Sequence, residues 1–266
     1  MKVNLHTHTM RCNHAEGTDE EYVLSAVENG YTKLGFSDHT PFPYDNGYSN
    51  WTKMTTEELP GYVASVLSLK EKYKDKIEIL IGLECESVPR FFPYLKELKQ
   101  DMDYLLLGNH ADWSIEEPYS GRLTKAWQLH RYFATAVEGM ESGLFLYLAH
   151  PDLMLGGYPA FDETAKYLSR QLCREANRLG MPLEYNLYGV LKGKKPGTLG
   201  YPYHPFWEIA AEENVTAVVG VDAHRPENFR DADLTGAIKM LRDMGIKVLE
   251  DPMDAEKKIA TQVQMG

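Results

Sequence analysis

The chain has 266 residues, of which 43% are hydrophobic and 25% charged, a composition typical of a globular protein and not of a disordered one. Its formal net charge of -11 argues against a nucleic-acid surface, although cations bound in an acidic site would still attract an anionic ligand. Three cysteines do not make a disulfide framework, and no apolar run is long enough to span a membrane. We therefore expect a cytoplasmic protein without a secretory leader.

Stretches with the periodicity of strands and helices alternate along the chain. We expect strands at Val3–Leu5, Lys33–Ser37, Ile77–Leu83, Tyr104–Gly108, Phe145–Ala149, Pro182–Asn186 and Ala217–Val221, with a last short one opening at Val248. We expect helices at Thr18–Asn29, Thr56–Tyr73, Phe92–Gln100, Leu123–Ser142, Asp162–Leu179, Pro205–Glu213 and Leu234–Met244. Long loops should run from Thr40 to Met54 and from Tyr188 to Tyr203. This alternation predicts a parallel α/β sheet or barrel, and without a linker it predicts a single domain, residues 1–266.

The opening stretch suggests a metal site. His6 and His8 are two residues apart near the end of the first strand, so their side chains should point to the same face. Two imidazoles on one face form a natural grip for a metal ion, and His14 follows from the next loop.

Other histidines and acids follow the later strands. Seven of the nine histidines fall just past strand ends, the exceptions being His130 and His204. The strand ends of a (β/α) barrel gather at one face, where such a cluster would repel itself unless it bound metal. The candidate ligands are His6, His8, His14, His39, Glu84, His110, His150, Asp222 and His224. A single catalytic zinc takes three protein ligands, so nine with a bridging carboxylate suggest three divalent ions, and the mixture of imidazole and carboxylate suits Zn, Fe or Mn.

At this point the sequence resembles the PHP (polymerase and histidinol phosphatase) family of metal-dependent phosphoesterases. The matching motifs are His6-Thr7-His8 with Cys12-Asn13-His14, Ser37-Asp38-His39-Thr40-Pro41, Gly82-Leu83-Glu84, Gly108-Asn109-His110, Ala149-His150-Pro151-Asp152 and Asp222-Ala223-His224. Within the family the chain is most similar to the stand-alone histidinol-phosphate phosphatases, through Lys53-Met54, Leu183-Glu184-Tyr185-Asn186 with Gly189, and Tyr201-Pro202.

The resemblance implies a distorted TIM-like (β/α)7 barrel with a trinuclear metal centre. One ion would take His6, His8, Glu84 and Asp222, a second His14, His39 and His224, and a third His110 and His150, with Glu84 bridging. The implied reaction is hydrolysis of a small phosphorylated metabolite, with L-histidinol phosphate the best single candidate, by a metal-bridging hydroxide.

Residues beside the ligands are candidates for the remaining roles. Asp38 could be the general acid for the leaving alkoxide or, with equal weight, a partner that holds a ligand in place. Lys192, Arg225 and Asn186 are the expected substrate contacts, with Lys192 standing nearest to the place where the phosphatase subgroup carries arginine. Aromatic residues of the first long loop could cover the substrate: Tyr44, Tyr48 and Trp51.

Three other functions compete with this reading. The chain could be a PHP phosphatase for a phosphotyrosine protein or a nucleotide, or a non-catalytic PHP module that binds metal. An amidohydrolase on a related barrel often uses a metal-bridging lysine at a strand end, and the sequence has none there. The sequence leaves the oligomeric state open.

Overall fold

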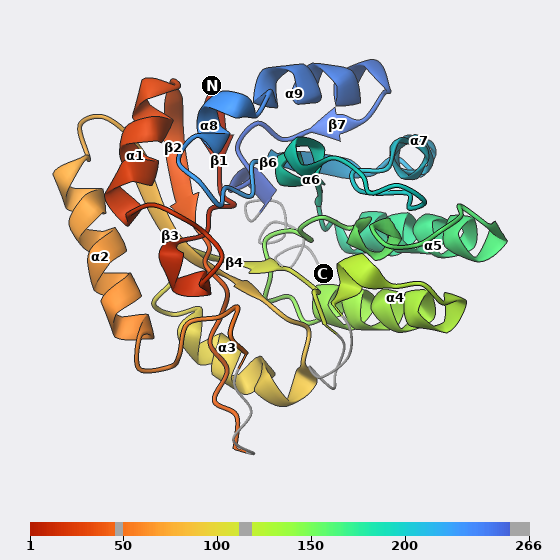
Figure 1. Ribbon diagram of the computed structural model, residues 1–266, viewed down its shortest axis with the longest axis horizontal. Helices are drawn as coiled ribbons and strands as arrows, with labels where there is room; N and C mark the ends of the chain where they lie inside the picture. The colour runs from red at the N-terminus through yellow and green to blue at the C-terminus, as the bar shows by residue number, and fades with distance from the viewer. Residues whose placement is uncertain (46–49, 112–118, 256–266) are drawn as a thin grey trace, which may run out of the picture.

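The computed structural model describes residues 1–45, 50–111 and 119–255. Strands occupy the interior and helices surround them (Figure 1). The strands are β1 Lys2–Asn4, β2 Tyr31–Phe36, β3 Glu78–Cys85, β4 Tyr104–Leu107, β5 Leu183–Asn186, β6 Thr216–Gly220 and β7 Lys247–Val248. The helices are α1 Asp19–Glu28, α2 Leu59–Lys72, α3 Phe92–Leu98, α4 Ala126–Glu141, α5 Glu163–Leu179, α6 Leu187–Lys192, α7 His204–Glu212, α8 Asn228–Asp231 and α9 Leu234–Asp243.

All strand pairs are parallel, which confirms the predicted α/β class. One sheet has the order β1-β2-β3-β4 and the other β5-β6-β7. Leu148 joins them by pairing with Leu107 of β4 on one side and with Leu183 of β5 on the other. The opposite edges meet beyond β1 and β6, where Thr7 pairs with Ala223. The strands therefore curl around a common interior, and their carboxyl ends face the same side.

Two sequence predictions need correction. The expected strand Phe145–Ala149 is shorter, because within the described part of the chain only residues 146–149 make backbone hydrogen bonds to the neighbouring strands, with Leu105 and Leu107 on one side and Pro182 and Glu184 on the other. The chain leaves the sheet at His150, whose φ is +31°. The expected loop from Tyr188 to Tyr203 begins instead inside helix α6. The Asn186 side chain caps this helix by accepting the N–H of Gly189, and Gly193 ends it with a φ of +65°. These two end signals are strong enough to form a short helix within a Gly- and Lys-rich stretch.

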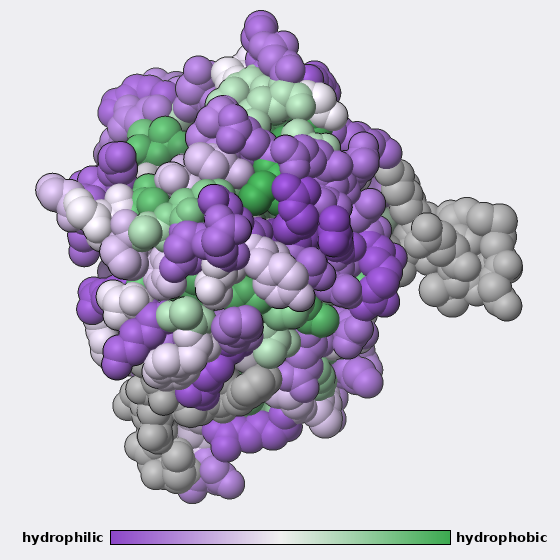
Figure 2. All heavy atoms as spheres, turned by 90° about the vertical axis from the view of Figure 1, so that its right-hand side faces the viewer, coloured by the Kyte–Doolittle hydropathy of each residue, from purple (hydrophilic) through white to green (hydrophobic). Residues whose placement is uncertain are grey.

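Other local predictions are confirmed. Thr18 and Glu21 form the expected capping box at the start of α1. Helix α5 packs its apolar side against α4 and α7, and the outer face over these helices is mostly hydrophilic, with apolar residues scattered (Figure 2). Among the described residues, no helix has both the length and the hydrophobicity needed to cross a membrane.

Tyr104 lies in the barrel interior below the strand ends, in a buried cluster with Leu5, Leu106 and Leu146. Its side chain is fully buried, and its hydroxyl lies 2.7 Å from the carbonyl oxygen of Leu5 and 2.9 Å from that of Phe36. The ring therefore ties the end of β2 to the segment that carries the first two histidines. Gly82 lies opposite Tyr104 in the β3–β4 pairing and leaves room for its ring.

We expect Gly82→Ala to lower the free energy of unfolding by about 1–3 kcal/mol, as overpacking of a core does. A Cβ at this position would lie 2.6 Å from Tyr104 Cζ and 2.7 Å from the Tyr104 carbonyl oxygen. Chemical denaturation of the two proteins measures the change. Gly61→Ala in α2 is the matched control, because a Cβ there meets no heavy atom within 4 Å, and it should be neutral or stabilising by up to about 1 kcal/mol. Equal stability of Gly82→Ala and the parent would contradict the packing argument.

Candidate metal centre

All nine predicted ligands lie at the carboxyl ends of the strands or in the loops that follow them. Seven of these residues are at most 7% exposed: His6, His8, His39, Glu84, His150, Asp222 and His224. His110 is partly buried and His14 is exposed at the rim. His130 lies within α4 and His204 begins α7, away from the cluster as predicted. Tertiary structure thus brings together residues that are up to 218 positions apart in sequence, from His6 to His224.

The Glu84 carboxylate is the centre of the cluster. This residue follows Leu83 within β3 and is 1% exposed. Its two oxygens lie close to five imidazoles: His6 Nε2 at 3.4 Å, His8 Nε2 at 3.4 Å, His39 Nδ1 at 3.0 Å, His110 Nε2 at 3.4 Å and His150 Nε2 at 3.0 Å. One carboxylate surrounded in this way has the position of a bridging ligand.

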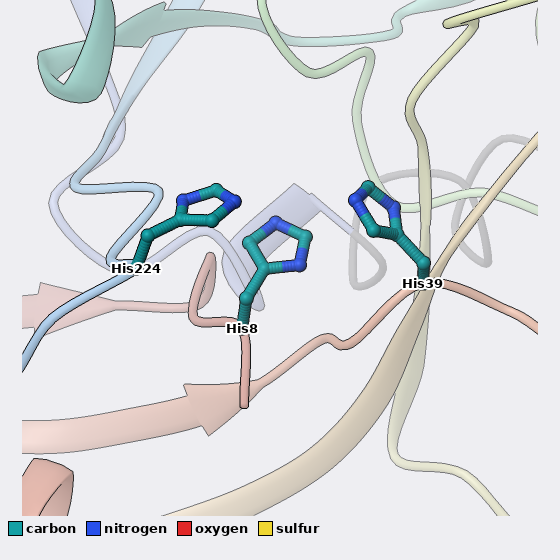
Figure 3. Close-up of side chains that lie close together, drawn as sticks. All are labelled: His8, His39 and His224. Atoms are coloured by element: carbon teal, nitrogen blue, oxygen red, sulfur yellow. The ribbon is translucent and has the colours of Figure 1, made fainter. Parts of the chain in front are cut away.

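Asp222 is the second acid of the cluster. Its Oδ1 lies 3.1 Å from His8 Nε2 and 3.3 Å from His224 Nδ1. Figure 3 shows the rings of His8, His39 and His224 converging from three separate loops. His14 extends this side of the cluster, with its Nε2 3.0 Å from His224 Nε2. Asp222 has a φ of +52°, a backbone conformation that turns its side chain inward at a cost in local strain.

Outer partners hold the rings in position. Glu184 Oε1 lies 2.7 Å from His6 Nδ1, Glu86 Oε1 lies 3.1 Å from His110 Nδ1, and Asp38 Oδ1 lies 3.7 Å from His8 Nδ1. Backbone carbonyls serve the two outer rings, Cys12 O for His14 at 2.7 Å and Asp222 O for His224 at 3.0 Å. Such partners fix the ring orientation, and here they leave Nε2 of His6, His8, His110 and His14 directed at the cluster.

The charges in the cluster shift its pKa values in opposite directions. Burial alone would raise the pKa of Glu84, but His110 and His6 hold it well below the usual range. Burial alone would lower the pKa of His8, but the neighbouring carboxylates of Asp222, Asp38 and Glu84 raise it to about 9. Burial, followed by repulsion from His8, holds the pKa of His39 and of His224 well below the ordinary value.

The arrangement fits divalent metal ions. Buried Glu84 Oε2 and Asp222 Oδ1 have no hydrogen bond of acceptable geometry within the described residues, although imidazole nitrogens surround them. His6 Nε2 and His8 Nε2 lie 3.2 Å apart, a distance at which at most one can carry a proton and donate it. Sets of three whose donor atoms lie within 4.8 Å of one another include His8–His39–His224, His6–His8–Asp222 and His6–Glu84–His150. Imidazole with carboxylate is the donor set of zinc, iron and manganese sites.

A cavity of about 640 Å³ opens above the cluster. Its basic side chains are Lys53, Arg122 and Lys192, and its aromatic ones are Trp51, Tyr119, Tyr188 and Tyr201. Two of these rings stack on candidate ligands, Tyr188 on His224 with centroids 4.4 Å apart and Tyr119 on His110 at 5.8 Å. The cavity therefore combines cations and flat apolar surfaces beside the acids of the cluster.

Comparison with known proteins identifies the family. The family model of the PHP domain matches residues 4–186. A protein of Deinococcus radiodurans named "Probable histidinol-phosphatase" is 32% identical over 254 residues, covering 90% of this chain and 92% of that protein. The chain belongs to the PHP family.

Two further relatives share the fold or the sequence of this PHP chain. The "Histidinol-phosphatase" of Bacillus subtilis is 24% identical over 254 residues, covering 83% of this chain and 92% of that protein. The crystal structure of a histidinol phosphate phosphatase from Lactococcus lactis, solved with zinc, L-histidinol and phosphate, superimposes with a TM-score of 0.71 at 18% identity. That comparison covers 93% of this chain and 95% of the other, so the fold extends over nearly the whole PHP chain.

Two of the predicted substrate contacts do not reach the cavity. Arg225 points to the surface, where it pairs with Glu16 at 2.7 Å. Asn186 is fully buried, and its amide donates to Glu184 and Asp222 while its oxygen accepts the N–H of Gly189. Neither lines the cavity in the described part of the chain. Lys192 does line it, with its ammonium 4.4 Å from the centre of the Tyr188 ring, and burial lowers the pKa of this lysine.

The position of Asp38 favours the supporting role over the acid role. It is fully buried and does not line the cavity. One oxygen accepts the hydroxyl and the N–H of Thr9, and the other accepts the N–H of His39 at 2.7 Å. With its oxygens occupied by Thr9 and the His39 N–H, this carboxylate fixes the two segments that carry His8 and His39.

Sequence reasoning did not identify Arg122, Tyr119, Glu86 or Glu184 as site residues. Arg122 and Tyr119 reach the cavity from the turn before α4, far from any strand end, so no spacing indicated them. Glu184 lies within β5, whose inward face could have been read as a site position. Of the proposed covering aromatics, Trp51 lines the cavity, Tyr44 does not, and Tyr48 lies outside the described residues.

We expect metal binding by the chelator-stripped protein to release protons at neutral pH and to tighten as the pH rises. The pKa of His8 is raised to about 9, so this ring carries an extra proton at neutral pH in the metal-free protein. Ligation requires neutral imidazole, so this proton must leave. Calorimetric titration with Zn²⁺ in buffers of different ionisation heat measures the release. Binding heats that do not depend on the buffer at neutral pH would contradict it.

Proposed function

We propose that this chain is a metal-dependent phosphomonoesterase that hydrolyses L-histidinol phosphate to L-histidinol and phosphate, with three divalent ions held by the nine clustered ligands. The observation that carries the proposal is the position of Glu84, which contacts five imidazoles beneath a cavity with basic and aromatic walls. A phosphomonoester carries the negative charge that the ions and cations would bind. The histidinol part carries an imidazole that matches the flat rings.

The relatives support the same substrate. The Deinococcus radiodurans and Bacillus subtilis proteins carry the histidinol-phosphatase name, and each aligns over more than four-fifths of this chain. The Lactococcus lactis enzyme, which has the same fold, binds both reaction products together with zinc. This supports zinc as the metal bound by this chain. Iron and manganese are the other two candidates that we propose for the three bound ions. The cysteines, all free and buried, agree with the expected cytoplasmic location.

Each part of the site has a distinct task in this mechanism. Ions bound at the cluster would act as Lewis acids toward the phosphoryl oxygens and would make hydroxide available near neutral pH. Arg122 and Lys192 would bind the outer phosphate oxygens, Arg122 with a planar fork and Lys192 as a point charge. The rings of Tyr119, Tyr188 and Trp51 would contact the organic part of the substrate and limit the access of water.

We expect the protein, purified without chelators, to contain about three divalent ions per chain and to release phosphate from L-histidinol phosphate in preference to other phosphomonoesters. Elemental analysis gives the metal content, and a panel containing a phosphotyrosine peptide and a nucleotide tests the preference. Glu84→Gln is the control, because loss of the central charge should remove both metal and activity. A preference for the peptide or nucleotide would replace the proposed substrate, and full metal content without phosphate release from any ester would favour the non-catalytic alternative.

We expect Lys192→Ala and Arg122→Ala each to raise KM for L-histidinol phosphate by about 10- to 100-fold, the effect of losing a charged hydrogen bond of about 1.5–3 kcal/mol. Both side chains line the cavity. Steady-state kinetics measures the change. Arg225→Ala is the matched control, because this arginine pairs with Glu16 at the surface and its loss should leave KM unchanged. If Arg225→Ala raised KM as much as the other two, the placement of the phosphate contacts would be wrong.

A further inference from the structure

Glu86 is a buried acid beside the cluster that no step of the proposed reaction uses. It is 1% exposed and lies just after β3, two residues beyond Glu84. Its Oε2 accepts the backbone N–H of His110 at 2.7 Å and that of Ala111 at 3.2 Å. Its Oε1 lies 3.1 Å from His110 Nδ1. Glu86 therefore holds both the backbone and the ring of one candidate ligand, with Nε2 of that ring directed at Glu84.

Lys53 supplies the counter-charge for Glu86. Lys53 is 7% exposed, and its ammonium lies 2.9 Å from Glu86 Oε1 and 5.8 Å from the centre of the Phe42 ring. In the described parts of the chain, Glu86 is the one carboxylate within ion-pair distance of this ammonium. Removal of either partner from a buried pair leaves a charge without compensation, so each fixes the position of the other.

The same lysine ends a segment that covers the cavity. Asn50, Trp51, Thr52 and Lys53 all line it. At the other end of this segment, the carbonyl oxygen of Trp51 accepts the Asn13 amide at 2.8 Å, and the Trp51 ring stands edge-on to His14 with centroids 6.4 Å apart. Segment 50–53 thus contacts the loop that carries His14 at one end and, through Glu86, the ligand His110 at the other.

The three acids behind the ligand rings, Glu184, Asp38 and Glu86, differ in the partners that hold them. Glu184 behind His6 receives the Asn186 amide, and Asp38 behind His8 receives Thr9 and the His39 N–H. Within residues 1–45, 50–111 and 119–255, Glu86 alone of the three is paired with a lysine, and that lysine belongs to the cavity wall. The orientation of His110 is therefore coupled to the wall that faces the substrate.

We propose that Glu86 is a positioning residue that aims His110 at the metal centre, and that Lys53 acts through Glu86 to hold cavity segment 50–53 in register with that ligand. The inference rests on the proposed function in that it takes His110 as a metal ligand. It goes beyond that function by making the affinity for one of the bound ions depend on a lysine that is not a ligand.

Metal affinity tests this proposal without any assay of phosphate release. Chelator-stripped Glu86→Gln, Lys53→Met and the double variant are titrated with Zn²⁺ against a chromophoric chelator, together with the parent. We expect Glu86→Gln to lower the affinity for the ion at His110 by about 10- to 100-fold, the range for loss of a residue that hydrogen-bonds to a metal ligand. Lys53→Met should weaken the same ion by a smaller factor, and the double variant should match Glu86→Gln alone, since Lys53 acts through Glu86.

Two controls separate positioning from general damage to the fold. Lys33→Met removes the lysine of a different ion pair, with Asp251 at 2.5 Å, by the same substitution, and should leave the metal affinity at the parent value because Lys33 does not line the cavity. Lys53→Arg keeps the charge and should restore most of the affinity lost in Lys53→Met. If Glu86→Gln fails to fold, the Lys53 variants still decide the question.

Parent affinity in Glu86→Gln, or a double variant whose loss is the product of the two single losses, would overturn the proposal. So would a Lys53→Met protein with parent metal affinity and a raised KM, which would make Lys53 a substrate contact instead. If the proposed substrate is wrong, the parent enzyme will release no phosphate from L-histidinol phosphate. The metal affinities of the variants can still be compared in that case, so the two proposals are tested separately.

Discussion

The structure depends on the contact of one buried carboxylate with five imidazoles. Glu84 is charged at the centre of the strand ends, and burial of such a charge is costly unless cations compensate it. Asp38, Glu86, Glu184 and Asp222 add further buried acids within the same face. The chain therefore concentrates negative charge where divalent ions would neutralise it, which reconciles a net charge of -11 with a substrate that is itself an anion.

The fold supplies the geometry that this charge cluster needs. Parallel strands place Glu84 of β3, the histidines after β1 and the ligands after β6 at one end, and a buried cluster that includes Tyr104 lies beneath them. Side chains of ordinary strands would point alternately in and out. His150 and Asp222 have positive φ values of +31° and +52°, and the side chains of both lie in the cluster. Local strain at these positions is maintained by the strands that enclose them.

The ligands are not equivalent in their surroundings. Carboxylates stand behind His6, His8 and His110, whereas backbone carbonyls stand behind His14 and His224. A carboxylate partner makes an imidazole a more basic ligand than a carbonyl does. The Lys53–Glu86 pair links this inner arrangement to the cavity wall, because both residues line the cavity.

Two properties of this protein could be predicted from sequence alone. The alternation of periodic segments predicted the parallel α/β class, and the histidines and acids placed just after strands predicted the nine residues that meet in the cluster. These features are local, because a strand pattern and the residue that ends it occupy neighbouring positions. Contacts across the barrel could not be predicted in this way. Only the tertiary structure showed Arg225 paired with Glu16, Asn186 tied between two acids and Arg122 in the cavity. The direction in which a side chain points from a loop depends on packing against distant segments, and no spacing in the chain records that packing.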